Sequence, residues 1–433
     1  MRVLGIGQYN SLGDLYWRLS RQGHEVRVHV AEPEAQGIFA GMVARVDDWR
    51  AELPWIRAAG KDGLIVFEST GQGVLQDQLR GDGYLVIGGC AWGDRLEGDR
   101  RYGQQVLCEA GLPIAPSWEF ENYDQALAHL TEHPARMVFK LCDESAASTR
   151  NYVGEMDDGS DVAALIRLEQ RRAPAGHTPR FILMRHLSGV EMGIGGYFNG
   201  HEFLRPLCLD WEHKHFFAGD IGELTGEMGT LVTYRNYERL YEQTLARLLV
   251  PLRKAGYCGY INLNTIINDE GVWPLEFTCR FGYPGFAILD ALHTDGWAPI
   301  LRAMGNGNNI EFATAAGFAV GVVLTVPPFP YEYGYEQLAK GMPIFFKPSM
   351  TEAERERLHY GELALEDGQL VTAGSIGYVM VATGTGADAR SAQQAAYSLA
   401  RKVVIPNMRY RNDIAERFLR EDQARLKVWG YLP

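Results

Sequence analysis

The sequence predicts an α/β protein whose N-terminal part is a doubly wound parallel sheet. A short apolar run, residues 2–7, ends in glycine and has the character of a strand buried on both faces. A helix is predicted directly after it, because Leu12, Leu15 and Leu19 follow one helical face up to Gly23. Further apolar runs of strand length occur at residues 25–30, 63–67 and 84–88. Strands and helices in this alternation are typical of a doubly wound fold.

The next part of the chain is expected to mix helices with antiparallel strands. A helix is predicted at residues 98–109, and the Pro-containing residues 112–116 break the chain after it. The elements predicted beyond that break are strands at 136–141 and 151–154, a helix at 161–171, strands at 181–186 and 190–198, and a helix at 237–255. Asn199-Gly200 is a strong signal for a hairpin turn.

The most informative stretch is a predicted β-hairpin formed by residues 260–267 and 275–282. Glu276, Thr278 and Arg280 alternate along its second strand and are therefore expected on one face. A carboxylate there can hold Mg²⁺, which keeps nucleotide phosphates among its ligands, and an arginine can clamp an anion. The pattern favours phosphoryl chemistry. This strand alone leaves a second interpretation open, a solvated strand face with an ion pair.

Composition excludes several classes of protein. The chain has 433 residues, of which 46% are apolar, and this length allows roughly three domains. A net charge of -12 argues against bulk nucleic-acid binding. The six cysteines are scattered without a Cys-x-x-Cys pair, which favours reduced thiols in a cytoplasmic protein over a disulfide framework. No apolar run has the length of a signal peptide or of a membrane span, so we expect no membrane partner.

A Gly5-Ile6-Gly7 segment is half of a dinucleotide-binding fingerprint, with the third glycine misplaced. It is the only feature that favours an NAD-dependent oxidoreductase, and the rest of the chain opposes that interpretation.

Three stretches carry a resemblance to a known family. His213-Lys214 precedes residues 219–229, which match the family's Gly-Asp-x-Gly-x-x-Thr-Gly-Gly-Met-Gly run. Residues 275–282 match its Glu-Phe-Asn-Cys-Arg-Phe-Gly, and residues 322–324 and 408–414 match its C-terminal domain. From end to end the chain resembles phosphoribosylamine–glycine ligase, also called glycinamide ribonucleotide synthetase, of the ATP-grasp superfamily.

The resemblance implies an ATP-grasp fold with an N-terminal doubly wound (preATP-grasp) domain and a small C-terminal α/β domain. The expected divisions are an N-terminal domain at 1–112, a lid subdomain at 113–186, a central subdomain at 187–316 and a C-terminal domain at 317–433. The implied partners are ATP, Mg²⁺ or Mn²⁺, and small amino-acid and amine substrates. A monomer or homodimer is expected.

The resemblance also implies roles for individual residues. Glu276 and Thr278 correspond to the metal ligands, and Arg280 and Lys214 to catalytic groups that hold the phosphate and neutralise the acyl phosphate. The ATP-binding positions are Arg100, Lys140, Ser148, Thr149, His186, Leu187 and Glu191. The substrate-binding positions are His213, Asp220, Thr225, Gly226, Met228, Gly229 and Gly282.

The implied reaction is ATP-dependent formation of a C–N bond through an acyl phosphate, which in the family joins glycine to 5-phosphoribosylamine in purine biosynthesis. The chain departs from the family in four places: the loop 145–150 lacks the family's glycines, residues 8–13 carry no arginine or lysine, residues 68–72 replace the family's Pro-Glu-x-Pro-Leu, and Tyr283 replaces an aspartate. Two alternatives therefore stay open. One is a ligase of the same fold with another amine acceptor, such as a modified nucleoside, and the other is a non-catalytic ATP-binding or scaffold protein.

Overall fold

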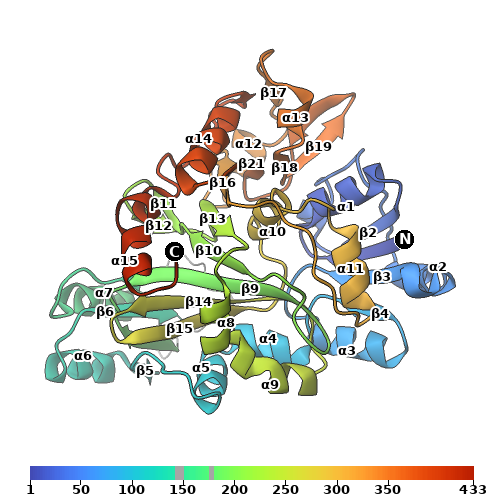
Figure 1. Cartoon of the computed structure of the whole chain (residues 1–433). Coiled ribbons are helices and arrows are strands. Elements are labelled where there is room, and N and C mark those ends of the chain that lie inside the picture. Colours follow the sequence, from blue (N-terminus) through green and yellow to red (C-terminus); the bar gives the residue numbers. More distant parts are fainter. Residues whose placement is uncertain (142–150, 175–179) are drawn as a thin grey trace.

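The computed structural model describes residues 1–141, 151–174 and 180–433 and begins with a parallel four-stranded sheet (Figure 1). Its strands run in the order β2 (Glu25–Val30), β1 (Arg2–Gly7), β3 (Gly63–Phe67) and β4 (Leu85–Ile87). The helices of this part are α1 (Gly13–Arg21), α2 (Leu53–Ala58), α3 (Gly73–Gly81) and α4 (Ala91–Gly98). The doubly wound start predicted from the apolar runs is confirmed. The strand order reverses between β1 and β3, the place where open α/β sheets bind ligands.

A second, antiparallel sheet forms the lobe that we call the small lobe, residues 117–185. Its strands run in the order β5 (Ser117–Phe120), β8 (Phe181–Arg185), β6 (Met137–Leu141) and β7 (Tyr152–Val153). Two helices, α6 (Tyr123–Glu132) and α7 (Ser160–Arg172), complete it. The Asn122 side chain accepts hydrogen bonds from the amides of Asp124 and Gln125, which fixes the start of α6.

The largest sheet has eight strands and occupies the middle of the molecule (Figure 1). Its order is β15 (Gly271–Thr278), β14 (Cys258–Asn268), β9 (Val190–Asn199), β10 (Cys208–Glu212), β13 (Gly229–Thr233), β16 (Phe318–Thr325), β21 (Tyr378–Gly386) and β18 (Leu358–Tyr360). Both faces of β9 and β14 are buried almost throughout, so these two strands form the core of the protein. The predicted hairpin is therefore the β14–β15 pair at one edge of this sheet.

The domain limits expected from the sequence remain a prediction, but the central sheet continues across the last of them. Strand β16 pairs with β13, and β21 and β18 extend the same sheet. Three two-stranded sheets lie around it: β11 (His215–Phe217) with β12 (Ile221–Leu224), β17 (Phe345–Phe346) with β22 (Val403–Val404), and β19 (Leu363–Glu366) with β20 (Gln369–Thr372). In the described part of the chain, no helix has the length and apolar character that crossing a membrane requires.

The helices of the second half are short. They are α8 (Glu238–Gln243), α9 (Leu249–Lys254), α10 (Gly285–Asp290), α11 (Ala298–Gly305), α12 (Tyr335–Leu338), α13 (Glu352–Arg355), α14 (Ala389–Ala400) and α15 (Gln423–Val428), with a π-helical turn at Phe418–Asp422 before α15. Packing of α11 against β3, β4 and β9 joins the N-terminal sheet to the central one.

Two helix predictions are corrected by the structure. The single helix expected at 237–255 is divided into α8, a 3₁₀ turn at Leu245–Leu248, and α9. The Thr244 hydroxyl donates to the Leu240 carbonyl, and Pro251 has no amide hydrogen to donate, so the helical hydrogen-bond ladder is interrupted. The helix expected at 98–109 begins two residues later as α5 (Arg100–Glu109), because the Asp99 side chain caps it by accepting from the Tyr102 amide at 3.0 Å.

A buried cluster around Asp14 joins α1 to β18 across the molecule. The Asp14 carboxylate accepts hydrogen bonds from Arg18 Nε at 2.6 Å, His359 Nδ1 at 2.9 Å and the Tyr360 amide at 3.0 Å. Burial alone would raise the pKa of Asp14, but the charge of Arg18 and the hydrogen bond from His359 lower this pKa to about 2. The ionised carboxylate therefore holds the N-terminal lobe against the far edge of the central sheet.

We predict that Asp14→Asn destabilises the protein at pH 7 by about 3 kcal/mol, because it removes the nearest charged partner of the buried Arg18 and leaves only the longer contacts with Asp290 and Glu356. The native pKa of about 2 lies below the unfolded value of about 3.9, so this contribution is present above pH 4 and is lost as the pH falls toward 2. Urea unfolding at pH 7 and pH 3 measures the difference, with Asp47→Asn as the exposed control. An Asp14→Asn variant as stable as the wild type at pH 7 would contradict the role of this cluster.

Candidate functional site

The candidate site is centred on Glu276 of β15, whose carboxylate faces three cations. Lys214 Nζ lies 2.8 Å from Glu276 Oε1, Arg100 Nη1 lies 3.3 Å from Oε2, and Lys140 Nζ lies 3.8 Å from Oε2. These cations come from different elements: Arg100 begins α5, Lys140 belongs to β6, and Lys214 follows β10. The site is therefore assembled where the small lobe and the central sheet meet.

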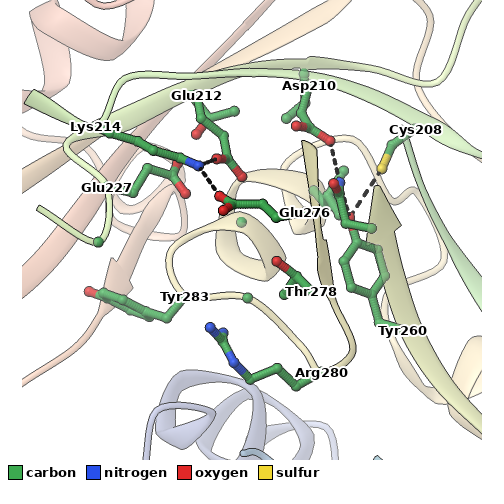
Figure 2. Close-up of a pocket in the computed structure, with 17 residues that line it drawn as sticks. Cys208, Asp210, Glu212, Lys214, Glu227, Tyr260, Glu276, Thr278, Arg280 and Tyr283 are labelled. Carbon is green, nitrogen blue, oxygen red and sulfur yellow. Dashed lines mark hydrogen bonds and ion pairs between the residues drawn. The ribbon is translucent and has the colours of Figure 1, made fainter. Parts of the chain in front are cut away.

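Lys214 is in turn surrounded by carboxylates. Its Nζ atom is 3.2 Å from Glu212 Oε2, besides its contact with Glu276 (Figure 2), and 3.9 Å from Glu191 Oε1. Asn264 Nδ2 donates to Glu191 Oε1 at 2.7 Å and orients that carboxylate. Positive and negative groups thus alternate across a small region, as in sites that handle phosphates and a metal cation.

The electrostatic consequences are visible in the pKa values. Lys214 and Lys140 together hold the pKa of Glu276 well below its usual range. Burial would lower the pKa of Lys214, but the carboxylates of Glu276 and Glu212 raise it well above normal. Burial and the neighbouring Arg100 lower the pKa of Lys140 to about 8. At neutral pH the centre therefore contains an ionised Glu276 and charged lysines.

A cavity of about 590 Å³ at this centre opens toward the small lobe, and we call it the larger cavity. Its ionic end contains Arg100, Lys140, Lys214 and Glu276. Its apolar end is formed by Val138, Val153, Met184, Leu187, Ile266 and Leu275, which pack into one cluster. Such a cavity can take a flat apolar ring at one end and a chain of anionic groups at the other.

The smaller cavity, about 200 Å³, shares Glu276 and Lys214 with the larger one (Figure 2). Its polar wall includes Asp210, Glu212 and Glu227. Asp210 accepts a hydrogen bond from Asn262 Nδ2 at 2.6 Å. Burial and the nearby Glu212 raise the pKa of Asp210 to about 8, and burial together with Glu212 raises the pKa of Glu227 well above its usual range. Glu212 is paired with Lys214, whereas Asp210 and Glu227 form no salt bridge with any residue that the structure describes.

The structure brings most of the residues singled out from the sequence to these cavities. Arg100, Lys140, His186, Leu187, Glu191, Asp220 and Thr225 line the larger cavity, Thr278, Arg280 and Gly282 line the smaller one, and Lys214, Gly226 and Glu276 line both. Glu276 and Thr278 share a strand face as predicted. Strand β15 ends at Thr278, so the prediction that Arg280 belongs to the strand is corrected, and its Nε pairs with Glu97 Oε1 at 3.2 Å.

Three expected substrate-binding residues lie away from both cavities. The His213 ring is buried and accepts a hydrogen bond from the Ala415 amide at 3.1 Å through Nε2, while burial and Arg411 lower its pKa to about 4. Met228 is fully buried. A side chain at Gly229 would meet the Gly321 carbonyl oxygen at 2.4 Å, so close strand packing requires glycine there. Ser148 and Thr149 lie outside the described residues.

Sequence reasoning missed several residues that the geometry places at the centre. Asp210 and Glu212 alternate with Lys214 on one side of the β10 segment, a pattern visible in the sequence. Glu227 stands where the family run has the second glycine of its Thr-Gly-Gly part, and this replacement was also visible in the sequence. Asn262 and Asn264 lie opposite Thr278 and Glu276 in the β14–β15 hairpin, so their alternation along the predicted hairpin could have indicated them.

Among the described residues, no group of three or more His, Cys, Asp and Glu side chains forms a closed metal site. Mg²⁺ needs fewer protein ligands, because it keeps waters and phosphates and takes one or two carboxylates. Glu276 and Thr278 supply a carboxylate and a hydroxyl on one strand face. The carboxylates of Glu191, Glu212 and Glu276 all lie within salt-bridge distance of the Lys214 ammonium. This region therefore already accommodates a positive charge among carboxylates. The donor set therefore fits a magnesium ion.

Comparisons with known proteins agree with this geometry. Residues 98–286 match the model of the phosphoribosylglycinamide synthetase ATP-grasp (A) domain, and residues 319–417 match that of the C domain. Phosphoribosylamine–glycine ligase of Pseudomonas aeruginosa is 26% identical over 98% of this chain and 100% of that protein.

Solved structures show the same fold. Phosphoribosylamine–glycine ligase of Thermotoga maritima has a TM-score of 0.71 at 23% identity, covering 96% of this chain and 100% of that one. The biotin carboxylase domain of the 2-oxoglutarate carboxylase of Hydrogenobacter thermophilus has a TM-score of 0.65 at 11% identity, with 94% and 91% covered. The predicted ATP-grasp fold is confirmed, and the chain belongs to the phosphoribosylamine–glycine ligase family.

Proposed function

We propose that this protein is an ATP-dependent ligase that joins a carboxylate to an amine through an acyl phosphate. The observation that carries the proposal is Glu276 with its three cations, which stands between a cavity of nucleotide size and a smaller polar cavity. If the two substrates occupy these two cavities, the transferred phosphoryl group has to move past Glu276 and its cations. Family membership supports the same reaction class.

The larger cavity suits ATP. Its apolar end can enclose the adenine ring, with Met184 and Leu275 as walls, and Glu191 stands at a position suited to accept hydrogen bonds from ribose hydroxyls. Arg100, Lys140 and Lys214 at the ionic end supply the charge that phosphates need. The Hydrogenobacter neighbour was solved in complex with MgADP, which supports a nucleotide in this fold.

Glu276 and Thr278 would hold Mg²⁺, which would supply positive charge to offset the negative charge that develops during transfer. The chain's own residues orient the reactants. The substrate carboxylate oxygen attacks the γ-phosphorus, the bond to the bridging oxygen breaks, and ADP leaves. The neutral amine nitrogen then attacks the acyl carbon, the C–O bond breaks, inorganic phosphate leaves, and the nitrogen loses one proton. Arg280 and Lys214 line the smaller cavity and are placed to hold the anionic acyl phosphate.

The relatives' name points to glycine and 5-phosphoribosylamine as the substrate pair. Phosphate release from MgATP across a matrix of amino acids and amines, with that pair as one cell, tests the proposal. Turnover in that cell supports the relatives' reaction, and turnover only in another cell supports a ligase with a different acceptor. Bound ATP with no turnover in any cell would contradict the ligase and favour a non-catalytic protein.

We predict that Glu276→Gln lowers kcat by about 100-fold or more. The reason is that the carboxylate which positions the cations around the transition state is lost. The measurement is ADP formation under saturating substrates. Glu366→Gln, an exposed change at the end of β19, is the matched control and should retain full activity. A Glu276→Gln enzyme with nearly normal kcat would contradict the central role of this carboxylate.

Glu191→Ala is expected to act on binding instead. Loss of an ionic acceptor for ribose hydroxyls should raise the KM for ATP by about 10-fold, while kcat falls much less. Steady-state kinetics at varied ATP distinguish the two variants. An unchanged KM for ATP would contradict the assignment of Glu191 to the nucleotide site.

A further inference from the structure

Tyr378, at the start of β21, reaches the short segment that links β12 to β13 at the functional centre. Its hydroxyl accepts a hydrogen bond from the Glu227 amide and donates one to the Glu227 carbonyl, each at 3.0 Å. One side chain therefore satisfies both backbone groups of a residue 151 positions away in the chain. The contact is close, because a side chain at Gly226 would place its Cβ atom 3.1 Å from the Tyr378 hydroxyl.

The same segment, residues 225–228, holds the backbone of Lys214. The Thr225 amide donates to the Lys214 carbonyl at 2.7 Å, and the Thr225 hydroxyl donates to that carbonyl at 2.8 Å. The Met228 amide donates to the His213 carbonyl at 2.7 Å. Because these bonds join the two stretches backbone to backbone, the position of Lys214 depends on the position of the segment that Tyr378 fixes.

Tyr378 is itself held by aromatic packing and by Glu362. Its ring packs against Phe329 with centroids 4.5 Å apart, and against Tyr283 with centroids 5.6 Å apart. The Glu362 amide donates to the Tyr378 carbonyl at 2.7 Å. Burial raises the pKa of Tyr378 above its ordinary value, so the hydroxyl stays protonated at neutral pH and can donate. Both the ring and the backbone of this tyrosine are therefore fixed.

The side chain of Glu362 holds the turn that leads into β21. Its buried carboxylate accepts from the Ile376 amide at 3.0 Å and from the Gly377 amide at 2.5 Å. Gly374 has a φ of +86°, which other residues rarely adopt, and a side chain there would place its Cβ atom 2.7 Å from the Glu362 carboxyl carbon. The turn is thus shaped around this carboxylate, which fixes the entry of Tyr378 into the central sheet.

We propose that Tyr378 is a positioning residue for the ligase reaction: held by Glu362, its hydroxyl sets the backbone of residues 225–228 and thereby directs Lys214 toward the acyl phosphate. This inference rests on the proposed function. It gives a residue of the stretch that matches the C domain a task at a centre built by the ATP-grasp domain.

Tyr378→Phe in the full-length protein tests the proposal by kinetics. The variant keeps the ring and its packing but loses both hydrogen bonds to Glu227, so Lys214 is held less well. Misplacing a group that acts on the transition state should lower kcat about 10-fold. The KM for ATP should change less than about 2-fold, because Arg100 and Lys140 still bind the phosphates. An unchanged kcat in an active enzyme would overturn the inference.

Tyr335→Phe is the matched control. Tyr335 is also a buried tyrosine of the C-terminal part, and its hydroxyl donates to the Ala373 carbonyl at 2.7 Å, a partner outside residues 225–228. Its removal costs a comparable hydrogen bond without releasing the segment, so kcat should stay normal. Retained MgADP affinity in both tyrosine variants reports that they are folded. A kcat lowered equally by both would reduce Tyr378 to a structural role and overturn the inference.

Chemical labelling of Lys214 gives a readout that is independent of turnover. Its side chain is 27% exposed and lines both cavities, so acetic anhydride can reach the ammonium group. The carboxylates of Glu276 and Glu212 hold the pKa of Lys214 well above normal and slow the reaction. Tyr378→Phe should raise the labelling rate about 5-fold, because a lysine that loses part of its charge pairing has a lower pKa. Peptide mass spectrometry measures this rate against the exposed Lys254.

Glu362→Gln tests the second step through its pH dependence. Burial raises the pKa of Glu362 to about 7, and the titratable groups that face it are the phenols of Tyr283, Tyr335 and Tyr378. No salt bridge joins Glu362 to any residue that the structure describes. The ionised carboxylate, present above pH 7, binds the amides of the turn more strongly than a protonated carboxyl or a glutamine does. Labelling of Lys214, relative to the wild type at the same pH, should therefore be about 3-fold higher at pH 8 and nearly equal at pH 6. The same ratio at both pH values would overturn the assignment of Glu362.

The two kinds of measurement separate this inference from the proposed function. Turnover with unchanged Lys214 labelling in Tyr378→Phe leaves the ligase standing and rejects the positioning role. Raised labelling without turnover of the wild type on any substrate pair does the reverse for the ligase, while the link from Tyr378 to Lys214 stands. If Tyr378→Phe does not fold, Glu362→Gln provides the same labelling test, and wild-type labelling in that variant at pH 8 overturns the inference.

Discussion

The arrangement of the functional centre depends on the attraction between one carboxylate and three cations. Glu276 faces Lys214, Lys140 and Arg100, which come from β15, the segment after β10, β6 and the start of α5. A buried charge removed from its partners is costly, because desolvation is no longer repaid. The small lobe and the central sheet therefore share one electrostatic centre, and both cavities border it. The relative position of these cavities follows from this ionic contact.

Much of the fold could be predicted because its signals are local. The parallel strands of the N-terminal sheet are short apolar runs, and the β14–β15 hairpin shows alternation around a glycine turn. Alternation also placed Glu276 and Thr278 on one face. The continuation of the central sheet through β16 could not be predicted in this way, because the pairing of β13 with β16 joins segments separated by about 90 residues and has no local signature. Asn262 and Asn264, by contrast, lie opposite Thr278 and Glu276 in the hairpin, so a local pairing brings them to the centre.

The site was predicted where the chain keeps the family pattern and missed where it departs from it. Arg100, Lys140 and Glu191 came from the resemblance and lie at the larger cavity. Glu227 replaces a glycine of the family run, and its carboxylate is buried with an oxygen that has no partner. An unsatisfied buried polar group costs about 1–3 kcal/mol, more if charged, so stability does not explain this oxygen. Local rules are broken in native proteins mainly where function requires it. The departures therefore indicate a changed substrate pocket on a retained nucleotide-binding framework.

The shared ionic boundary also couples the two cavities. Lys214 and Glu276 line both, so a charge placed in either cavity alters the potential in the other. Phosphates in the larger cavity attract Lys214, Lys140 and Arg100, and this weakens the hold of these cations on Glu276. Because coupling of binding free energies is reciprocal, any effect of nucleotide on binding in the smaller cavity equals the effect of that second ligand on nucleotide binding. The same lysine and glutamate that organise the centre would carry this coupling.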